Sequence, residues 1–156
     1  MRAEPSHTVL LEIDFQHWII ESIAHRPVTD QAAAVRADPT GRGASFHPQL
    51  APVPGDLVLS KHSRNIFDNP DVETNLRLLG VTDVIITGIA TDHGVALAAR
   101  TSHALGYRTS VVADACAGTS AESHDRALAE LSRDGITVIR DRYPAPRRNV
   151  TRVRSD

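Results

Sequence analysis

Residues 83–105, with the sequence DVIITGIATDHGVALAARTSHAL, are the stretch that decides the fold. The run VII at 84–86 is apolar without alternation, which is typical of a strand buried on both faces of a parallel sheet. We expect Gly88 to break this strand, and Thr91 or Asp92 to cap the helix that follows. A strand, a tight turn and a helix in this order expose backbone N–H groups at the carboxyl edge of a sheet, where they favour negative charge. Any chemistry of the protein is therefore expected at this edge.

Apolar patterning on either side of this stretch predicts further strands and helices. The strands lie at 8–13, 56–60, 109–113 and 136–139, and two more helices lie at 72–79 and 121–133. Helices that alternate with apolar strands predict a three-layer α/β/α fold with a mainly parallel, doubly wound sheet of about five strands. Each of the three predicted helices has one face expected to pack on the core. These positions are Val72, Leu76 and Leu79 in the first helix, Val95, Ala98 or Ala99, Ser102 and Leu105 in the second, and Ala127, Leu128 and Leu131 in the third. Gly106 is expected to end the second helix, and Thr119 or Ser120 to cap the third.

Composition narrows the classes of function. The chain has 156 residues, a formal net charge of −2 and a pI near 6.4, which gives no electrostatic reason to expect a nucleic-acid partner. It has no apolar run near 20 residues and no signal-peptide pattern, so we expect a soluble, cytoplasmic protein without membrane attachment. One cysteine, and eight histidines without HxH or HxxxH spacing, predict no disulfide and no metal site. Glycine motifs for nucleotides and a GxSxG elbow are absent, so no nucleotide cofactor is expected.

The two ends of the chain differ in what they can bury. Residues 1–140 hold all of the predicted strands and helices and are expected to form a single domain. Residues 141–156 are basic, contain prolines and have little apolar surface to bury. We therefore expect them to form a flexible or partner-contacting tail.

Two charged residues close predicted strands. Asp14 follows the strand at 8–13, and Lys61, the single lysine beside sixteen arginines, follows the strand at 56–60. The carboxyl ends of parallel strands meet at one edge of a sheet, where ligands bind in open α/β folds. Side by side, the two residues would form an ion pair, which is either part of a site or purely structural; Asp14 has the further alternative of capping a helix.

Several separated motifs resemble the isochorismatase-like hydrolase superfamily, which includes isochorismatases, nicotinamidases and related cysteine amidases. The resemblance covers residues 8–139 and holds in the right order. The matching segments are LEIDFQ at 11–16, HPQL at 47–50, PGDLVLSK at 54–61, Phe67, IITGIATD at 85–92, LGYR at 105–108 and VADACA at 112–117.

The resemblance implies catalytic roles for Asp14 and Lys61. In the family, the cysteine nucleophile stands two residues after the Thr-Asp pair, and here that position is Gly94. Glycine cannot form a thioester, so the cysteine amidase mechanism cannot run through it. Cys116 matches a common non-catalytic cysteine of the family and is expected to be structural. Glycine at this position resembles the isochorismatase branch, which hydrolyses a vinyl ether without covalent catalysis.

In that branch Asp14 would be the general acid, and Lys61 would orient the substrate and stabilise charge. The resemblance further implies a small-molecule substrate, no cofactor, a homo-oligomer, and a cis peptide between Ile89 and Ala90. The other residues that it implies for substrate binding or backbone oxyanion contacts are Gln16, Phe67, Ile89, Ala90, Thr91, Asp92 and His93, the last with a solvated or helix-capping role as an equal alternative.

One departure from the family concerns residues 15–56. The family has a full helix and a second strand before the lysine strand, and these residues cannot supply both, so about one βα unit is missing. This leaves two alternatives open: a degenerate, non-catalytic relative that serves as a binding or assembly module, and an amidase with an atypical nucleophile. Contact between Asp14 and Lys61 around an opening at Gly94 would favour an enzyme.

Overall fold

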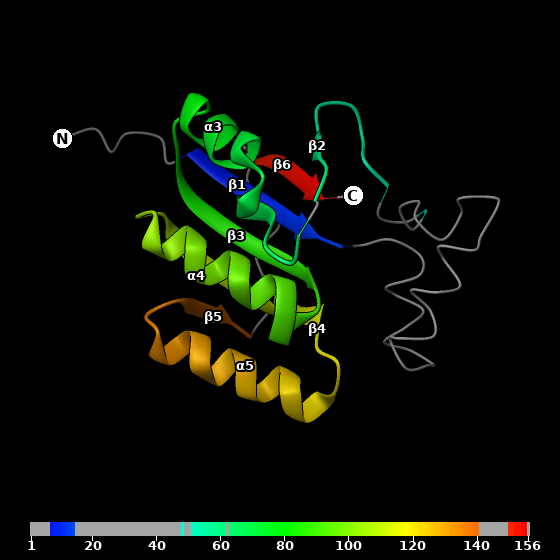
Figure 1. Cartoon of the computed structure of the whole chain (residues 1–156), viewed down its shortest axis with the longest axis vertical. Helices are drawn as coiled ribbons and strands as arrows, with labels where there is room; N and C mark the ends of the chain where they lie inside the picture. Colours follow the sequence, from blue (N-terminus) through cyan, green and yellow to red (C-terminus); the bar gives the residue numbers. More distant parts are fainter. Residues whose placement is uncertain (1–6, 15–47, 49–50, 62, 141–149, 156) are drawn as a thin grey trace.

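The computed structural model describes residues 7–14, 48, 51–61, 63–140 and 150–155. Six strands form one sheet in the order β2-β6-β1-β3-β4-β5, and every pair of neighbours is parallel (Figure 1). The predicted α/β class with a mainly parallel, doubly wound sheet is thereby confirmed. The strands are β1 (His7–Ile13), β2 (Leu57–Leu59), β3 (Val81–Ile89), β4 (Arg108–Ala117), β5 (Thr137–Ile139) and β6 (Val150–Ser155).

Strand β6 corrects two predictions. Within the described residues the sheet has six strands rather than about five, and residues 150–155 are not a tail but a strand between β1 and β2. Val153 is 1% exposed and belongs to the core cluster. Strand β6 therefore lies between the first strand and the lysine strand, where the sequence of residues 15–56 predicted no second strand; residues 15–47 and 49–50 are outside the described part of the chain. Residues 141–149, the rest of the predicted tail, lie outside the described part of the chain.

Three α-helices connect the strands from β2 to β5. They are α3 (Pro70–Leu78), α4 (Ala96–Ala104) and α5 (Ala121–Arg133), with two short turns, η2 (Ile66–Asp68) and the π-helical η3 (Thr91–Val95). The crossovers through α3, α4 and α5 all run in the same direction along the sheet, so right-handed connections place the three helices on one face (Figure 1). Helix α5 has the bounds predicted from the sequence, and the side chain of Ser120 caps it by accepting from the Ser123 N–H.

The core lies between this face of the sheet and the three helices. Alternate residues of β1 (Val9, Leu11 and Ile13) are fully buried there, as period-2 patterning requires. The predicted core positions of α5 are all buried, and those of α3 and α4 are buried except at the helix ends. Leu79 and Leu105, both predicted to face the core, are 41% and 37% exposed because each is the C-cap residue after the last helical turn.

Gly88 does not break its strand, contrary to the prediction, and β3 continues through it to Ile89. Its φ of +131° is a conformation that side chains rarely adopt, and an added Cβ would stand 2.1 Å from the carbonyl oxygen of Ile13. Glycine is therefore required for the close approach of β3 to the end of β1, not for a turn. This approach brings the end of β1 against the residues that open α4.

Candidate active site

The carboxyl edge of the sheet has a topological switch point between β1 and β3. From β1 the sheet extends through β6 to β2 on one side, and through β3 to β4 and β5 on the other. Ligands of open α/β sheets bind at the carboxyl ends of the strands beside such a point. The residues that follow β1, β2 and β3 therefore form the candidate site.

Asp14 and Lys61 are in direct contact at this edge. The Lys61 ammonium donates a hydrogen bond to the Asp14 carboxylate, although the two residues are 47 positions apart. Their side chains are only 14% and 11% exposed, so the pair is largely withdrawn from water. The predicted ion pair is confirmed as a contact.

The backbone of Asp14 is in the left-handed region, with φ of +55°, which is uncommon for a residue other than glycine. Aspartate tolerates this region better than most side chains, yet the conformation still costs about 1 kcal/mol or more and collects at functional sites. It bends the chain at the end of β1, where the carboxylate contacts Lys61.

Lys61 is held by the segment between β2 and α3. Asn69, the N-cap of α3, donates from its side-chain amide to the carbonyl of Ser60 at 2.9 Å, while its oxygen accepts from the Asp71 N–H. Asn65 ties the following loop to α4 by donating to Thr101 Oγ1 at 2.8 Å. The residue before the lysine and the loop after it are therefore fastened to two different helices.

Gly94 lies against the ion pair. A Cβ placed on it would be 3.4 Å from Lys61 Nζ, 3.3 Å from the carbonyl oxygen of Arg64 and 3.5 Å from Ile13 Cγ2. A side chain at this position would therefore touch the lysine. The peptide between Ile89 and Ala90 is cis, as the resemblance implied, and the carbonyl of Ala90 accepts from the N–H groups of residues 93 and 95 in η3.

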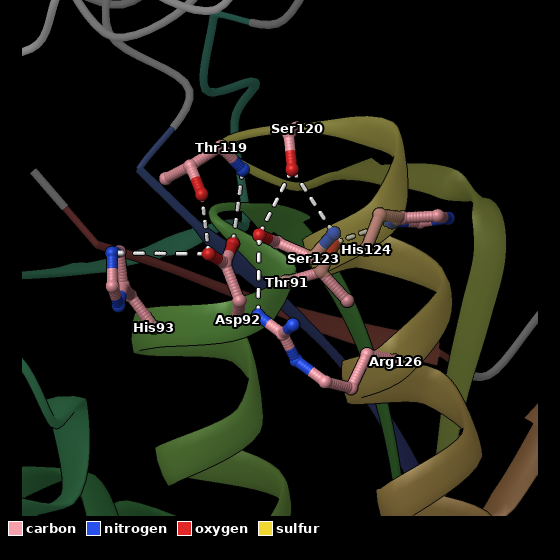
Figure 2. A network of polar contacts seen from close by, with 8 residues as sticks. All are labelled: Thr91, Asp92, His93, Thr119, Ser120, Ser123, His124 and Arg126. Carbon is pink, nitrogen blue, oxygen red and sulfur yellow. Dashed lines mark hydrogen bonds and ion pairs between the residues drawn. The ribbon is translucent and has the colours of Figure 1, made fainter.

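The side chains of η3 do not cap the helix, contrary to the prediction. The N-cap position is Ala90, which offers no side-chain bond. Figure 2 shows instead that Thr91 and Asp92 reach the start of α5. Thr91 Oγ1 and His124 Nδ1 are hydrogen-bonded to each other at 2.8 Å, and the Asp92 carboxylate accepts from the backbone N–H of Thr119 at 3.0 Å and from its hydroxyl.

This network fixes the charge of Asp92. Burial raises the pKa of its carboxyl, but the hydrogen bonds from the side chain and backbone of Thr119 outweigh that effect and hold the pKa below its usual value. Asp92 is thus an anchor between η3 and α5. His93 lies beside this anchor, with its side chain 56% exposed and its ring Nε2 3.9 Å from Asp92 Oδ2 (Figure 2).

With this geometry in place, comparison with known proteins decides the family. The family model described as the isochorismatase domain matches residues 20–142. The chain belongs to the isochorismatase family.

The chain is also similar to individual known proteins, two by sequence and one by fold. The chain is 31% identical over 106 residues to the uncharacterized isochorismatase family protein YwoC of Bacillus subtilis, covering 67% of this chain and 56% of the relative. It is 39% identical over 83 residues to the ureidoacrylate amidohydrolase RutB of Methylobacterium radiotolerans, covering 53% of this chain and 32% of that one. The crystal structure of the nicotinamidase SaPncA from Staphylococcus aureus superposes with a TM-score of 0.70 at 20% identity, covering 86% of this chain and 99% of that chain. The chain spans about half the length of the first curated relatives that it matches.

The remaining residues singled out from the sequence are Phe67, Ile89, Gln16 and Cys116. Phe67 sits in η2, half-buried against the core, and Ile89 is 8% exposed at the end of β3. Gln16 lies outside the described residues. Cys116 of β4 pairs in register with Gly88 of β3, and burial raises the pKa of the Cys116 thiol to about 12. A thiol held in its protonated form is a poor nucleophile, which agrees with a structural role for this cysteine of the isochorismatase family.

Sequence reasoning missed His124 and Thr119 as partners of η3. Nothing in the sequence around α5 marks them, because their role depends on how α5 docks beside η3. It also missed Arg154, although the β-branched residues Val150, Thr151 and Val153 before it favour a strand. Within the described ranges, no three or more His, Cys, Asp or Glu side chains gather in a way that could hold a metal ion. No helix in those same ranges has the length and apolarity to cross a bilayer.

Proposed function

We propose that this protein is a hydrolase of the isochorismatase type that works without a cysteine nucleophile. The observation that carries the proposal is the contact between Asp14 and Lys61 beside a glycine at the nucleophile position. A Cβ at Gly94 would touch Lys61 Nζ, so this position, where cysteine amidases of the family have their nucleophile, lies next to the ion pair. Here it carries no side chain.

The reaction that suits this arrangement is the hydrolysis of a vinyl ether. Asp14, as the general acid, transfers a proton to the enol-ether carbon, which leaves an oxocarbenium ion at the neighbouring carbon. Water adds to that carbon, and the resulting hemiketal collapses to a ketone and an alcohol, so that one water is consumed. For the first step the Asp14 carboxyl must carry a proton, and the water that adds to the oxocarbenium ion gives up one proton, which returns to the Asp14 carboxylate and regenerates the acid. The Lys61 ammonium keeps its protons throughout, holds the substrate and stabilises the Asp14 carboxylate that proton transfer leaves.

The environment of the pair supports a site over a purely structural role. A largely buried ion pair gains little net stability, because removing both charges from water offsets most of their attraction. Asp14 additionally holds a left-handed backbone conformation. Two such features at the switch point of an α/β sheet are more readily explained by a site than by packing.

The relatives leave the substrate class open to test. One is named a ureidoacrylate amidohydrolase and one structural neighbour a nicotinamidase, and these names refer to amides. Gly94 offers no thiol for amide chemistry of the cysteine type, which is why we place vinyl ethers first. Amide hydrolysis with an atypical nucleophile is the alternative that the same experiment separates.

The experiment is a substrate screen of small vinyl ethers and small amides, followed by variants. Asp14→Asn should lower turnover of the vinyl-ether substrate by about 10²-fold or more, and Lys61→Met should lower it as well, while circular dichroism shows the fold retained. Asp83→Asn is the matched control and should leave turnover unchanged, because Asp83 accepts two hydrogen bonds from Arg108 at the opposite end of the strands.

Full turnover in Asp14→Asn refutes the role of Asp14 as the general acid. Turnover of amides alone assigns the amidase alternative, and no turnover of either class assigns the binding module.

A further inference from the structure

Strand β6 sets the distance between the two strands that carry the candidate catalytic pair. It lies directly between β1 and β2 in the sheet and pairs in parallel with both. Adjacent strands lie about 4.8 Å apart, so β1 and β2 are separated by roughly 9.6 Å. Lys61 therefore meets Asp14 across the end of β6. Any displacement of β6 would change the distance that the Lys61 side chain must span to contact the Asp14 carboxylate.

A buried arginine of β6 bridges the same two strands. Arg154 Nε lies 2.9 Å from Glu12 Oε2 of β1 and 2.9 Å from Asp56 Oδ2, the residue that precedes β2. All three side chains are nearly closed to solvent: 5% exposed for Arg154, 10% for Glu12 and 6% for Asp56. Glu12 is two residues before Asp14, and Asp56 is five residues before Lys61. The bridge thus joins the strands just behind the pair.

The bridge lies on the face of the sheet opposite the helical core. Val153 of β6 belongs to the core cluster on one face, so the alternation of a strand turns Arg154 to the other face, where it is in register with Glu12. Asp56 is itself fastened, because its carboxylate accepts from the Val53 N–H at 2.9 Å. A rigid guanidinium with several donors is suited to hold two carboxylates at once, and the compact ammonium of lysine is not.

We propose that Arg154 is a positioning residue for the Asp14–Lys61 pair. By binding Glu12 and Asp56, it fixes β1 and β2 at the separation from which Lys61 contacts Asp14. Its effect on turnover rests on the proposed function, whereas its effect on the geometry of the pair does not. The C-terminal strand is then a part of the active-site framework, and the chemistry at one edge depends on the last residues of the chain.

A purely structural bridge would lower stability without changing the pair in the folded molecules. A positioning bridge changes the surroundings of Lys61 in molecules that remain folded. Lys61 is the only lysine of the chain. Protein grown with lysine labelled with carbon-13 at Cε therefore gives one side-chain signal, which reports the pair without any substrate.

The test compares Arg154→Met with two controls. Arg108→Met removes another arginine that bridges neighbouring strands, at the opposite end of β3 and β4, and Leu131→Ala removes buried packing in α5. Asp14→Asn supplies the signal of a broken pair. We expect Arg154→Met to move the lysine signal toward that of Asp14→Asn, and both controls to leave it in place.

Turnover gives the second measurement once a substrate is known. Arg154→Met should lower kcat about tenfold or more with a smaller change in KM, since a displacement of about 1 Å near reacting groups costs on the order of 10²-fold in rate. Arg154→Lys keeps the charge but lacks the Nε that lies against both carboxylates, so its kcat should lie between those of the wild type and Arg154→Met.

Two results overturn the inference. One is a folded Arg154→Met protein with an unchanged lysine signal. If Arg154→Met does not fold, Glu12→Gln takes its place, because it keeps an acceptor for Arg154 while removing one charge; an unchanged signal in that folded variant also overturns the inference. A shifted signal in a protein that hydrolyses no substrate upholds the positioning role and refutes the proposed function.

Discussion

Replacing Gly94 with alanine places a methyl group beside the Asp14–Lys61 ion pair. Its nearest neighbours would be the carbonyl oxygen of Arg64 at 3.3 Å, Lys61 Nζ at 3.4 Å and Ile13 Cγ2 at 3.5 Å. These contacts are close but not overlapping, and one of them is the mobile end of a side chain. Gly94 also has no left-handed φ, so alanine fits its backbone.

The expected change in stability is therefore small. Alanine restricts the unfolded chain and stabilises by about 0.4–1 kcal/mol, while slight overpacking destabilises by about 1–3 kcal/mol. The free energy of unfolding of Gly94→Ala should thus lie within about 2 kcal/mol of the wild type. Gly88→Ala is the contrasting variant, because its Cβ would stand 2.1 Å from the Ile13 carbonyl oxygen at a φ of +131°. It should lose more than about 4 kcal/mol.

The expected change in turnover is large by comparison. A methyl group that a substrate must avoid costs about 1–3 kcal/mol of transition-state binding, which lowers kcat/KM about 10–200-fold. Urea unfolding followed by circular dichroism measures the stability of both variants, and initial rates on the screened substrate measure turnover of Gly94→Ala. Equal losses of stability in the two glycine variants would refute the packing argument. Undiminished kcat/KM in Gly94→Ala would show that the substrate does not bind against Gly94.

Three further predictions test the surrounding structure. Cys116, with its pKa raised to about 12, should react with iodoacetamide at pH 8 on the order of 10³-fold more slowly than a free thiol. Its alkylation should leave activity unchanged. Fast labelling of Cys116 in the native protein would contradict its burial. Asp92→Asn should lower the free energy of unfolding at pH 7 by about 1 kcal/mol after solvent screening. Because the folded-state pKa of Asp92 is lowered, this loss should be complete above the unfolded pKa of about 3.9 and should vanish as the pH falls through the folded-state pKa. A loss that persists in acid would refute the role of the charge. Leu128→Ala should cost about 2–5 kcal/mol in urea unfolding, since the side chain is fully buried, and a loss below 1 kcal/mol would mean that α5 packs loosely.

The strands and helices that the sequence predicted well share one property. In α5, the cap at Ser120, the apolar stripe of Leu128 and Leu131 and the following Gly135 all agree, so its bounds were predicted without error. The strand at 8–13 was likewise predicted from its apolar run, and Asp14 was singled out because it is the residue that follows this strand. Local signals of this kind depend on residues a few positions apart, which a sequence displays directly.

The errors arose where distant residues decide the conformation. The β-branched residues Val150, Thr151 and Val153 are typical of a strand, but the arginines among them favoured a solvated tail. Arg154 is buried only because Glu12 and Asp56, more than 90 positions earlier, supply two carboxylates. Gly88 was predicted to break β3 for a similar reason, since the need for glycine comes from the carbonyl of Ile13 on a neighbouring strand.

The sequence by itself determined the alternation of strands and helices, the strand ends that carry Asp14 and Lys61, and the glycine at position 94. These follow from local pattern and from the resemblance to the isochorismatase-like hydrolases. Only the tertiary structure decided that Lys61 contacts Asp14, that Thr91 and Asp92 bind α5 instead of capping a helix, and that the C-terminal strand separates β1 from β2. The physical reason is that strand order, and every contact between strand ends, depends on how the whole chain buries its apolar faces and pairs its buried charges, and no short stretch contains that information.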